Sequence, residues 1–190
     1  MQLAESGERR ILAQRIRERA RLTGRFTLRS GAVSEVYWDK YRFESDPALL
    51  RAIAQAMVPL LPPNVDRVAG LELGGVPLAT ALALETGLPA LFVRKAAKTY
   101  GTANLVEGGC SPGERVIVVE DVITSGGQVC KSVRQIRELG LVAEHVGCVV
   151  DRDEGGAGNI AAAGCALIPL FTMGDLECLA AEADGAPQTG

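Results

Sequence analysis

One short stretch of the sequence, RVIVVEDVITSGGQV at 115–129, combines residue types that could bind a phosphorylated sugar. Two adjacent carboxylates, Glu120 and Asp121, follow an apolar run that predicts a buried strand over 115–119. A turn of hydroxyl residues and glycines then enters an expected helix over 128–139, where backbone N–H groups can converge on an anion. Carboxylates repel a phosphate, so they need hydroxyl donors or a metal. The pattern therefore predicts a site for a ribose 5-phosphate at the carboxyl end of a strand.

Three cations form a second group that could bind phosphates. Arg94, Lys95 and Lys98 follow an expected strand over 90–93. Arg offers a bidentate fork and Lys a point charge to phosphate oxygens. In isolation such a group is more often a solvated basic turn, but here it opens a long glycine-rich connection, residues 94–113, that is typical of an active-site lid. The group therefore indicates neutralisation of a diphosphate.

Strands and helices alternate along the chain and would position these groups. Such an alternation predicts an α/β fold with a twisted, mostly parallel sheet and helices on both faces. Apolar residues that alternate with polar ones around a Ser-Gly turn predict a β-hairpin within 25–41. The expected strands span 66–71, 90–93, 115–119, 142–150 and 166–171, and the expected helices span 5–22, 47–61, 76–86 and 128–139.

The domain organisation is expected to be simple. No internal repeat or linker divides the chain, so the sequence predicts one domain over 1–190. A small N-terminal elaboration is expected over about 20–45, and the connection 94–113 is expected to be flexible. Residues 182–190 are polar and are expected to form a disordered tail.

The composition argues against several kinds of partner. The formal net charge is −3 and aromatic residues make up 4% of the chain, so no nucleic acid partner is expected. The longest apolar stretch, 160–174, contains Pro169 and is too short to span a membrane. Five scattered cysteines without a CxxC pair predict free, reduced thiols. No secretory signal is visible, so the expected location is the cytoplasm.

The stretch at 115–129 resembles the phosphoribosyl-diphosphate signature of the type I phosphoribosyltransferases. Other segments resemble the orotate phosphoribosyltransferases in particular, and they occur in that family's order. These segments are FTLRSG at 26–31, GGVPLA at 74–79, VRKAAK at 93–98, EG at 107–108 and DR at 151–152. The resemblance covers about residues 20–155, which is most of the chain.

The resemblance implies the type I phosphoribosyltransferase fold with an N-terminal hood, and an activity. A phosphoribosyl group would pass from 5-phosphoribosyl 1-diphosphate to orotate, giving orotidine 5'-phosphate and diphosphate in pyrimidine (UMP) biosynthesis. The implied cofactor is Mg²⁺, held mainly by the sugar diphosphate and water near Glu120 and Asp121, with no direct protein ligand. The implied assembly is a homodimer in which the lid closes over the partner subunit's site, so that Lys98 would act across subunits.

The same resemblance implies roles for single residues. Lys98, Glu120 and Asp121 would be catalytic and would also bind the sugar diphosphate. Orotate would lie against the hood and against Arg152, whose guanidinium matches the orotate carboxylate. The further expected ligands of the sugar diphosphate are Arg94, Lys95, Val122, Ile123, Thr124, Ser125, Gly126, Gly127, Gln128, Gly74 and Gly75, and the expected orotate ligands are Arg29, Tyr37, Trp38, Thr124 and Arg152.

Two departures from the family and two alternatives remain open at this point. Tyr100 stands where many relatives carry His, and Gly74 stands where many carry Lys. The only histidine, His145, lies in an expected strand, so histidine acid–base catalysis is not expected. A phosphoribosyltransferase for a purine or another pyrimidine is one alternative, although Arg152 favours an acidic base. A nucleotide-sensing regulator is the other, and the net acidity and the complete set of lid cations argue against it.

Overall fold

Six strands form the central sheet of the chain, for which the computed structural model describes residues 2–27, 31–96 and 105–184. Their order is β5-β4-β3-β6-β7-β8, and every neighbouring pair is parallel except β4 with β5. This confirms the predicted α/β fold with a mostly parallel sheet. The strands are β3 (Arg67–Leu71), β4 (Ala90–Val93), β5 (Val106–Glu107), β6 (Arg115–Ile123), β7 (Val142–Asp151) and β8 (Ala166–Thr172).

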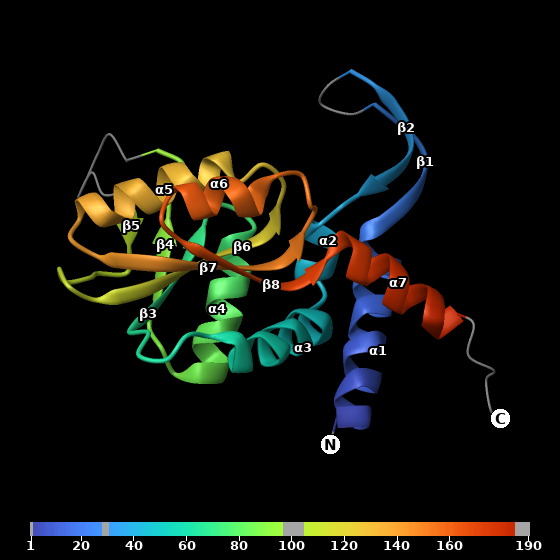
Figure 1. Ribbon diagram of the computed structural model, residues 1–190, viewed down its shortest axis with the longest axis horizontal. Helices are drawn as coiled ribbons and strands as arrows, with labels where there is room; N and C mark the ends of the chain where they lie inside the picture. The colour runs from blue at the N-terminus through green and yellow to red at the C-terminus, as the bar shows by residue number, and fades with distance from the viewer. Residues whose placement is uncertain (1, 28–30, 97–104, 185–190) are drawn as a thin grey trace.

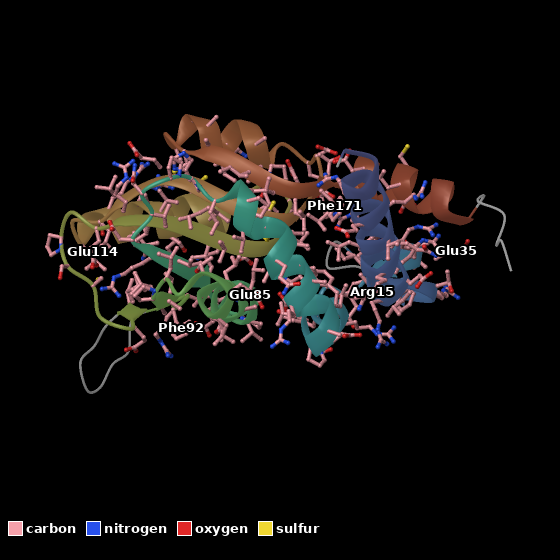
Figure 2. All side chains as sticks on the ribbon, turned by 90° about the horizontal axis from the view of Figure 1, so that it is seen from below. Arg15, Glu35, Glu85, Phe92, Glu114 and Phe171 are labelled. Atoms are coloured by element: carbon pink, nitrogen blue, oxygen red, sulfur yellow. The ribbon has the colours of Figure 1, made fainter. Side chains whose placement is uncertain are left out.

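Helices cover both faces of this sheet (Figure 1). One face carries α3 (Pro47–Met57), the short 3-10 helix η1 (Val58–Leu60) and α4 (Gly75–Thr86), and the other carries α5 (Gly127–Glu138) and α6 (Gly156–Ala162). Figure 2 shows the same layers from below, with side chains filling the space between sheet and helices. Helices α1 (Gln2–Ala20) and α7 (Met173–Asp184) pack against each other beside β8.

Strand β6 shows why an uninterrupted apolar run suits a sheet covered on both faces. Successive side chains of a strand point to opposite faces. Ile117 and Val119 join the core on the α3–α4 side, whereas Val116 and Val118 join the core beneath α5 and α6. All four are at most 2% exposed. A central strand of this kind fixes the position of whatever follows it in sequence.

The expected hairpin forms a separate two-stranded ribbon. Strand β1 (Arg21–Thr27) pairs antiparallel with β2 (Val33–Trp38), and the ribbon extends away from the sheet (Figure 1). The short helix α2 (Tyr41–Glu44) follows it and leads back to α3. The Asp46 side chain accepts hydrogen bonds from the backbone N–H groups of Ala48 and Leu49, which caps α3 as its sequence indicates.

Several boundaries differ from the expectations. Strand β6 continues to Ile123 rather than ending at residue 119, because β7 supplies pairing partners as far as Asp151. Elements β5, α6 and α7 were not expected from the sequence, and α7 extends to Asp184, past the start of the expected tail at residue 182. Helix α6 has the sequence GAGNIAA, in which glycines lower the intrinsic helix propensity. Packing against the sheet therefore decides its conformation.

Two global features can be stated for the described part of the chain. None of its helices is both long and apolar enough to cross a membrane. Cys110, Cys130, Cys148 and Cys165 are free thiols, and the last three are buried.

Candidate functional site

The turn between β6 and α5 has the geometry of an anion site. Gly126 lies in the left-handed region with φ of 72°, which favours glycine, and it directly precedes the first residue of α5. The first backbone N–H groups of a helix have no acceptor within the helix and carry its positive dipole end. Thr124 and Ser125 are exposed at this point, and the Asn159 amide of α6 donates to the Ser125 carbonyl oxygen at 2.9 Å. Binding of a 5-phosphate here stays a prediction.

Helix α6 packs closely against this turn at Gly156. A Cβ atom on Gly156 would lie 2.5 Å from both the Thr124 carbonyl oxygen and Ile123 Cγ2, whereas one on Gly158 would meet nothing within 4 Å. We expect Gly156→Ala to weaken binding of 5-phosphoribosyl 1-diphosphate and to cost about 1–3 kcal/mol of stability, because the turn must shift. Gly158→Ala in the same helix should leave binding unchanged and add about 0.5–1 kcal/mol. Thermal unfolding and calorimetric titration measure both effects, and equal behaviour of the two variants would contradict this account.

The two adjacent acids lie among the last four residues of β6, where they meet Lys40, a residue that was not expected from the sequence. The Asp121 side chain is fully buried, and that of Glu120 is 15% exposed. Lys40 Nζ lies 2.9 Å from both carboxylate oxygens of Asp121 and 3.9 Å from Glu120 Oε1. Glu44 of α2 is also buried, at 7% exposure. The structure therefore places three carboxyl groups and one ammonium in a single cluster.

Burial and mutual repulsion change the proton affinity of this cluster. Desolvation, followed by repulsion from Asp121, raises the pKa of both Glu44 and Glu120 to about 9. Burial lowers the pKa of Lys40, but the neighbouring Asp121 and Glu120 carboxylates more than offset this, so the net pKa is raised. Glu44 and Glu120 therefore take up protons at higher pH than exposed carboxyl groups do, while Lys40 keeps its charge.

Gly74 and Gly75 let the backbone at the start of α4 approach these acids closely. A Cβ atom on Gly74 would collide with the Asp121 carboxylate, and one on Gly75 would collide with the Val119 carbonyl oxygen. Both glycines are buried. The two expected ligands thus lie against the acid pair, and their contact with a diphosphate remains a prediction.

Two of the three predicted cations follow β4 beside the acids. The buried Nε of Arg94 has no hydrogen-bond partner among the described residues. The Lys95 side chain is close enough to lower the pKa of Glu120, and its backbone N–H donates to Glu72 Oε2 at 2.9 Å. Lys98, Tyr100 and the expected base ligand Arg29 lie outside the described residues.

A cavity of about 290 Å³ lies next to the acid cluster and brings the other predicted base ligands together. They come from three elements: Tyr37 and Trp38 from β2, Thr124 from the end of β6, and Arg152 from the end of β7. Arg152 is exposed, and its Nε lies 3.0 Å from Glu154 Oε1. The other lining residues are Asp39, Lys40, Tyr41, Val122, Val150 and Met173. Aromatic walls with two cations suit a flat, anionic ring.

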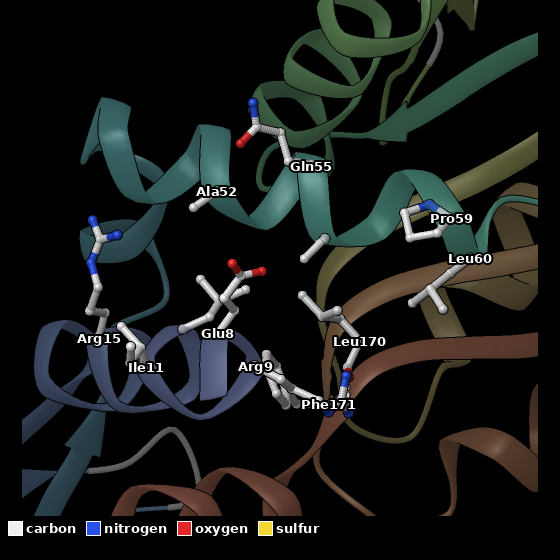
Figure 3. A pocket seen from close by; sticks show the side chains of 12 residues that line it. Glu8, Arg9, Ile11, Arg15, Ala52, Gln55, Pro59, Leu60, Leu170 and Phe171 are labelled. Atoms are coloured by element: carbon white, nitrogen blue, oxygen red, sulfur yellow. Dashed lines mark hydrogen bonds between the residues drawn. The ribbon is translucent and has the colours of Figure 1, made fainter. Parts of the chain in front are cut away.

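A second groove lies elsewhere in the molecule and contains none of the predicted residues (Figure 3). It has a volume of about 580 Å³ and runs between α1, the α3–η1 segment and β8. Its walls are mostly apolar, with Glu8, Arg9 and Arg15 contributed by α1. Among the described residues, no group of His, Cys, Asp and Glu is arranged to hold a metal ion by itself.

Known proteins resemble this chain in both sequence and fold. The model of the phosphoribosyl transferase domain family matches residues 42–158. The orotate phosphoribosyltransferase of Nocardioides sp. (strain ATCC BAA-499 / JS614) is 49% identical over 157 residues, which cover 83% of this chain and 88% of that protein. The crystal structure of Mycobacterium tuberculosis H37Rv orotate phosphoribosyltransferase with Fe(III) dicitrate superposes with a TM-score of 0.82 at 34% identity, covering 89% of this chain and 98% of the other. The same enzyme with 5-phospho-α-D-ribosyl 1-diphosphate gives a TM-score of 0.77 at 32% identity, covering 90% and 99%.

Proposed function

Because the chain belongs to the orotate phosphoribosyltransferase family, we propose that it joins orotate to the phosphoribosyl group of 5-phosphoribosyl 1-diphosphate. The products are orotidine 5'-phosphate and diphosphate, and the reaction is that of a pentosyltransferase in pyrimidine biosynthesis. The observation that carries the proposal is the junction of three sites at the carboxyl end of β6. The base cavity, the acid pair and the helix N-terminus adjoin one another there, and we assign them to the base, the ribose and the 5-phosphate respectively.

In this proposal the chain binds the sugar diphosphate at both of its ends. Thr124 to Gln128 receive the 5-phosphate through backbone N–H groups and hydroxyls at the start of α5. Val122 and Ile123 form the end of the strand that leads there. Arg94, Lys95 and Lys98 meet the diphosphate, and Gly74 and Gly75 keep the backbone close to it. This leaves C1 of the ribose between the base cavity and the departing diphosphate.

The proposed chemistry is a displacement at C1 by orotate N1, with inversion. Positive charge develops on the ribose as the bond to diphosphate breaks. Glu120 and Asp121 hold the ribose hydroxyls and stabilise this charge, so positioning and electrostatics supply the rate acceleration. Arg152 fixes the orotate carboxylate, and Tyr37 and Trp38 flank the ring.

The proposal includes a cofactor, an assembly and a location. Glu120 Oε2 is a buried carboxylate oxygen without a hydrogen-bond partner among the described residues, and the negative charge of the acid pair would favour a hard cation bound to the substrate nearby. Mg²⁺, held mainly by the sugar diphosphate and water beside these acids, would neutralise the leaving diphosphate. By analogy with the family, two copies of the chain form a homodimer in which the lid brings Lys98 to the partner subunit's site. The free thiols of Cys110, Cys130, Cys148 and Cys165 fit a reducing compartment such as the cytoplasm.

The direct test is the ultraviolet loss of orotate when the purified protein is mixed with 5-phosphoribosyl 1-diphosphate and Mg²⁺. We expect loss only when all three are present, and little turnover of uracil, adenine or hypoxanthine. Faster turnover of another base would assign the enzyme to that base. Binding of the sugar diphosphate without turnover of any base would favour a regulator on the same fold.

A further inference from the structure

Lys40 and Glu44 reach the acid pair from a different part of the chain. Lys40 directly precedes α2, and Glu44 is the last residue of that helix. Lys40 Nζ lies 2.9 Å from both carboxylate oxygens of Asp121 and 3.9 Å from Glu120 Oε1. The Glu44 side chain is buried at 7% exposure, and burial together with repulsion from the nearby Asp121 carboxylate raises its pKa to about 9. Asp121 is thus paired with the Lys40 ammonium, and the buried Glu44 carboxyl lies near enough to interact with it electrostatically.

The other charged groups around Asp121 make Lys40 its principal partner. Among the described residues, Lys40 is the cation within 4 Å of both Asp121 and Glu120. Lys95, after β4, acts on Glu120 from farther away. The titratable groups that face this cluster from all the packed elements are Lys40, Tyr41, Glu44, Lys95, Glu120, Cys148 and Asp151.

Lys40 also borders the cavity that holds the predicted base ligands. Its ammonium therefore lies between the base cavity and the acids. The Asp121 side chain is fully buried, and the partly exposed Lys40 side chain lies 2.9 Å from it. At this location Lys40 can orient the Asp121 carboxylate toward a sugar in the site.

We propose that Lys40 and Glu44 are positioning residues that hold the Asp121 carboxylate ready for the ribose hydroxyls, Lys40 as its cation and Glu44 as a neutral hydrogen-bond donor. The inference rests on the proposed function and adds two residues to its machinery. Lys40 keeps negative charge at the acid pair despite the burial of both acids. Glu44, protonated below about pH 9, donates to Asp121 without adding a further negative charge.

Loss of the ammonium should change the pH dependence of the reaction. The Lys40 charge lowers the pKa of Glu120, so Lys40→Met raises that pKa further. An opposite charge at this distance shifts a carboxyl pKa by about 1–3 units. We therefore expect the acidic limb of kcat/KM for the sugar diphosphate to move to higher pH by about one unit or more, with a loss of about tenfold or more at neutral pH. Lys40→Arg should restore the wild-type limb.

Loss of the Glu44 proton donor should act differently. Gln matches protonated Glu in shape and can donate to Asp121, so Glu44→Gln should keep kcat/KM near the wild-type value at neutral pH. Glu44→Leu keeps the volume but removes the donor, and it should lower kcat/KM by about threefold to tenfold, the effect of one hydrogen bond.

The experiment measures kcat and KM for both substrates between about pH 6 and pH 10 for these variants, with Lys131→Met on the exposed face of α5 as the matched control. The dissociation constant of the sugar diphosphate, measured by calorimetry without any base, should follow the same pH shift. This second readout tests the inference even if orotate proves to be the wrong base. Thermal unfolding identifies variants that lose activity through misfolding.

Three results would overturn the inference. An increase in KM for orotate alone in Lys40→Met would make Lys40 a base ligand. A loss that is equal at every pH would make its role structural. Equal activities of Glu44→Gln and Glu44→Leu would show that Glu44 only fills space. A double-mutant cycle adds a direct check, because Lys40→Met should have little further effect once Asp121 is replaced by Asn.

Discussion

Replacing Asp121 with Asn should reduce kcat about 10²–10³-fold, the range found when one group that stabilises transition-state charge is removed. Asn has the same shape but no negative charge, so it cannot balance the positive charge that develops on the ribose. It also leaves the Lys40 ammonium, 2.9 Å away, without its principal anion. Steady-state assays of orotate loss measure the effect, and the change should appear in kcat more than in KM for orotate.

Two comparisons separate this chemical effect from a general loss of structure. The first is Glu144→Gln, which removes another carboxylate that is paired with a cation. Glu144 lies on the exposed part of β7, 2.8 Å from Arg115, and its replacement should leave kcat unchanged. Circular dichroism and thermal unfolding of Asp121→Asn show whether the fold survives. A folded Asp121→Asn enzyme with the turnover of the wild type would refute the assigned role of this carboxylate.

The parts of the site that the sequence predicted are those that depend on neighbours along the chain. The buried strand β6, the turn at Gly126 and the helix α5 follow one another within 24 residues, so apolar runs and glycines identify them directly. The cations after β4 were predicted in the same way. The parallel sheet then brings these segments to one edge, because consecutive strands of such a fold run in the same direction.

Other parts depend on contacts between segments that are distant in sequence. Lys40 and Asp121 are 81 positions apart, and nothing in the local sequence around Lys40 indicates that it will contact a buried acid. Helix α6 has weak helix-forming sequence, and β5 has two residues, so both depend on their neighbours for their conformation. The final residues of β6 are strand because β7 pairs with them, which local apolarity alone could not predict.

Arg152 provides the prediction that tests the choice of base. Arg152→Met should lower kcat/KM for orotate about 10- to 100-fold, the value of one charge-assisted contact of about 1.5–3 kcal/mol. Its effect on uracil, which has no carboxylate, should be small, so discrimination between the two bases should shrink. Arg152→Lys should restore only part of the activity, because an ammonium cannot make the bidentate contact of a guanidinium. Kinetics with both bases measure these effects.

Replacing the neighbouring acid, Glu154, should change KM for orotate in the opposite direction. Glu154 Oε1 lies 3.0 Å from Arg152 Nε, and both side chains are exposed. A substrate carboxylate must therefore compete with Glu154 for the guanidinium. Glu154→Gln removes this competitor and should lower KM for orotate modestly, with a larger effect at low ionic strength because salt screens exposed charges. If Arg152→Met and Glu154→Gln both leave KM for orotate unchanged, the carboxylate binds elsewhere, and the base cavity must recognise the ring by other contacts.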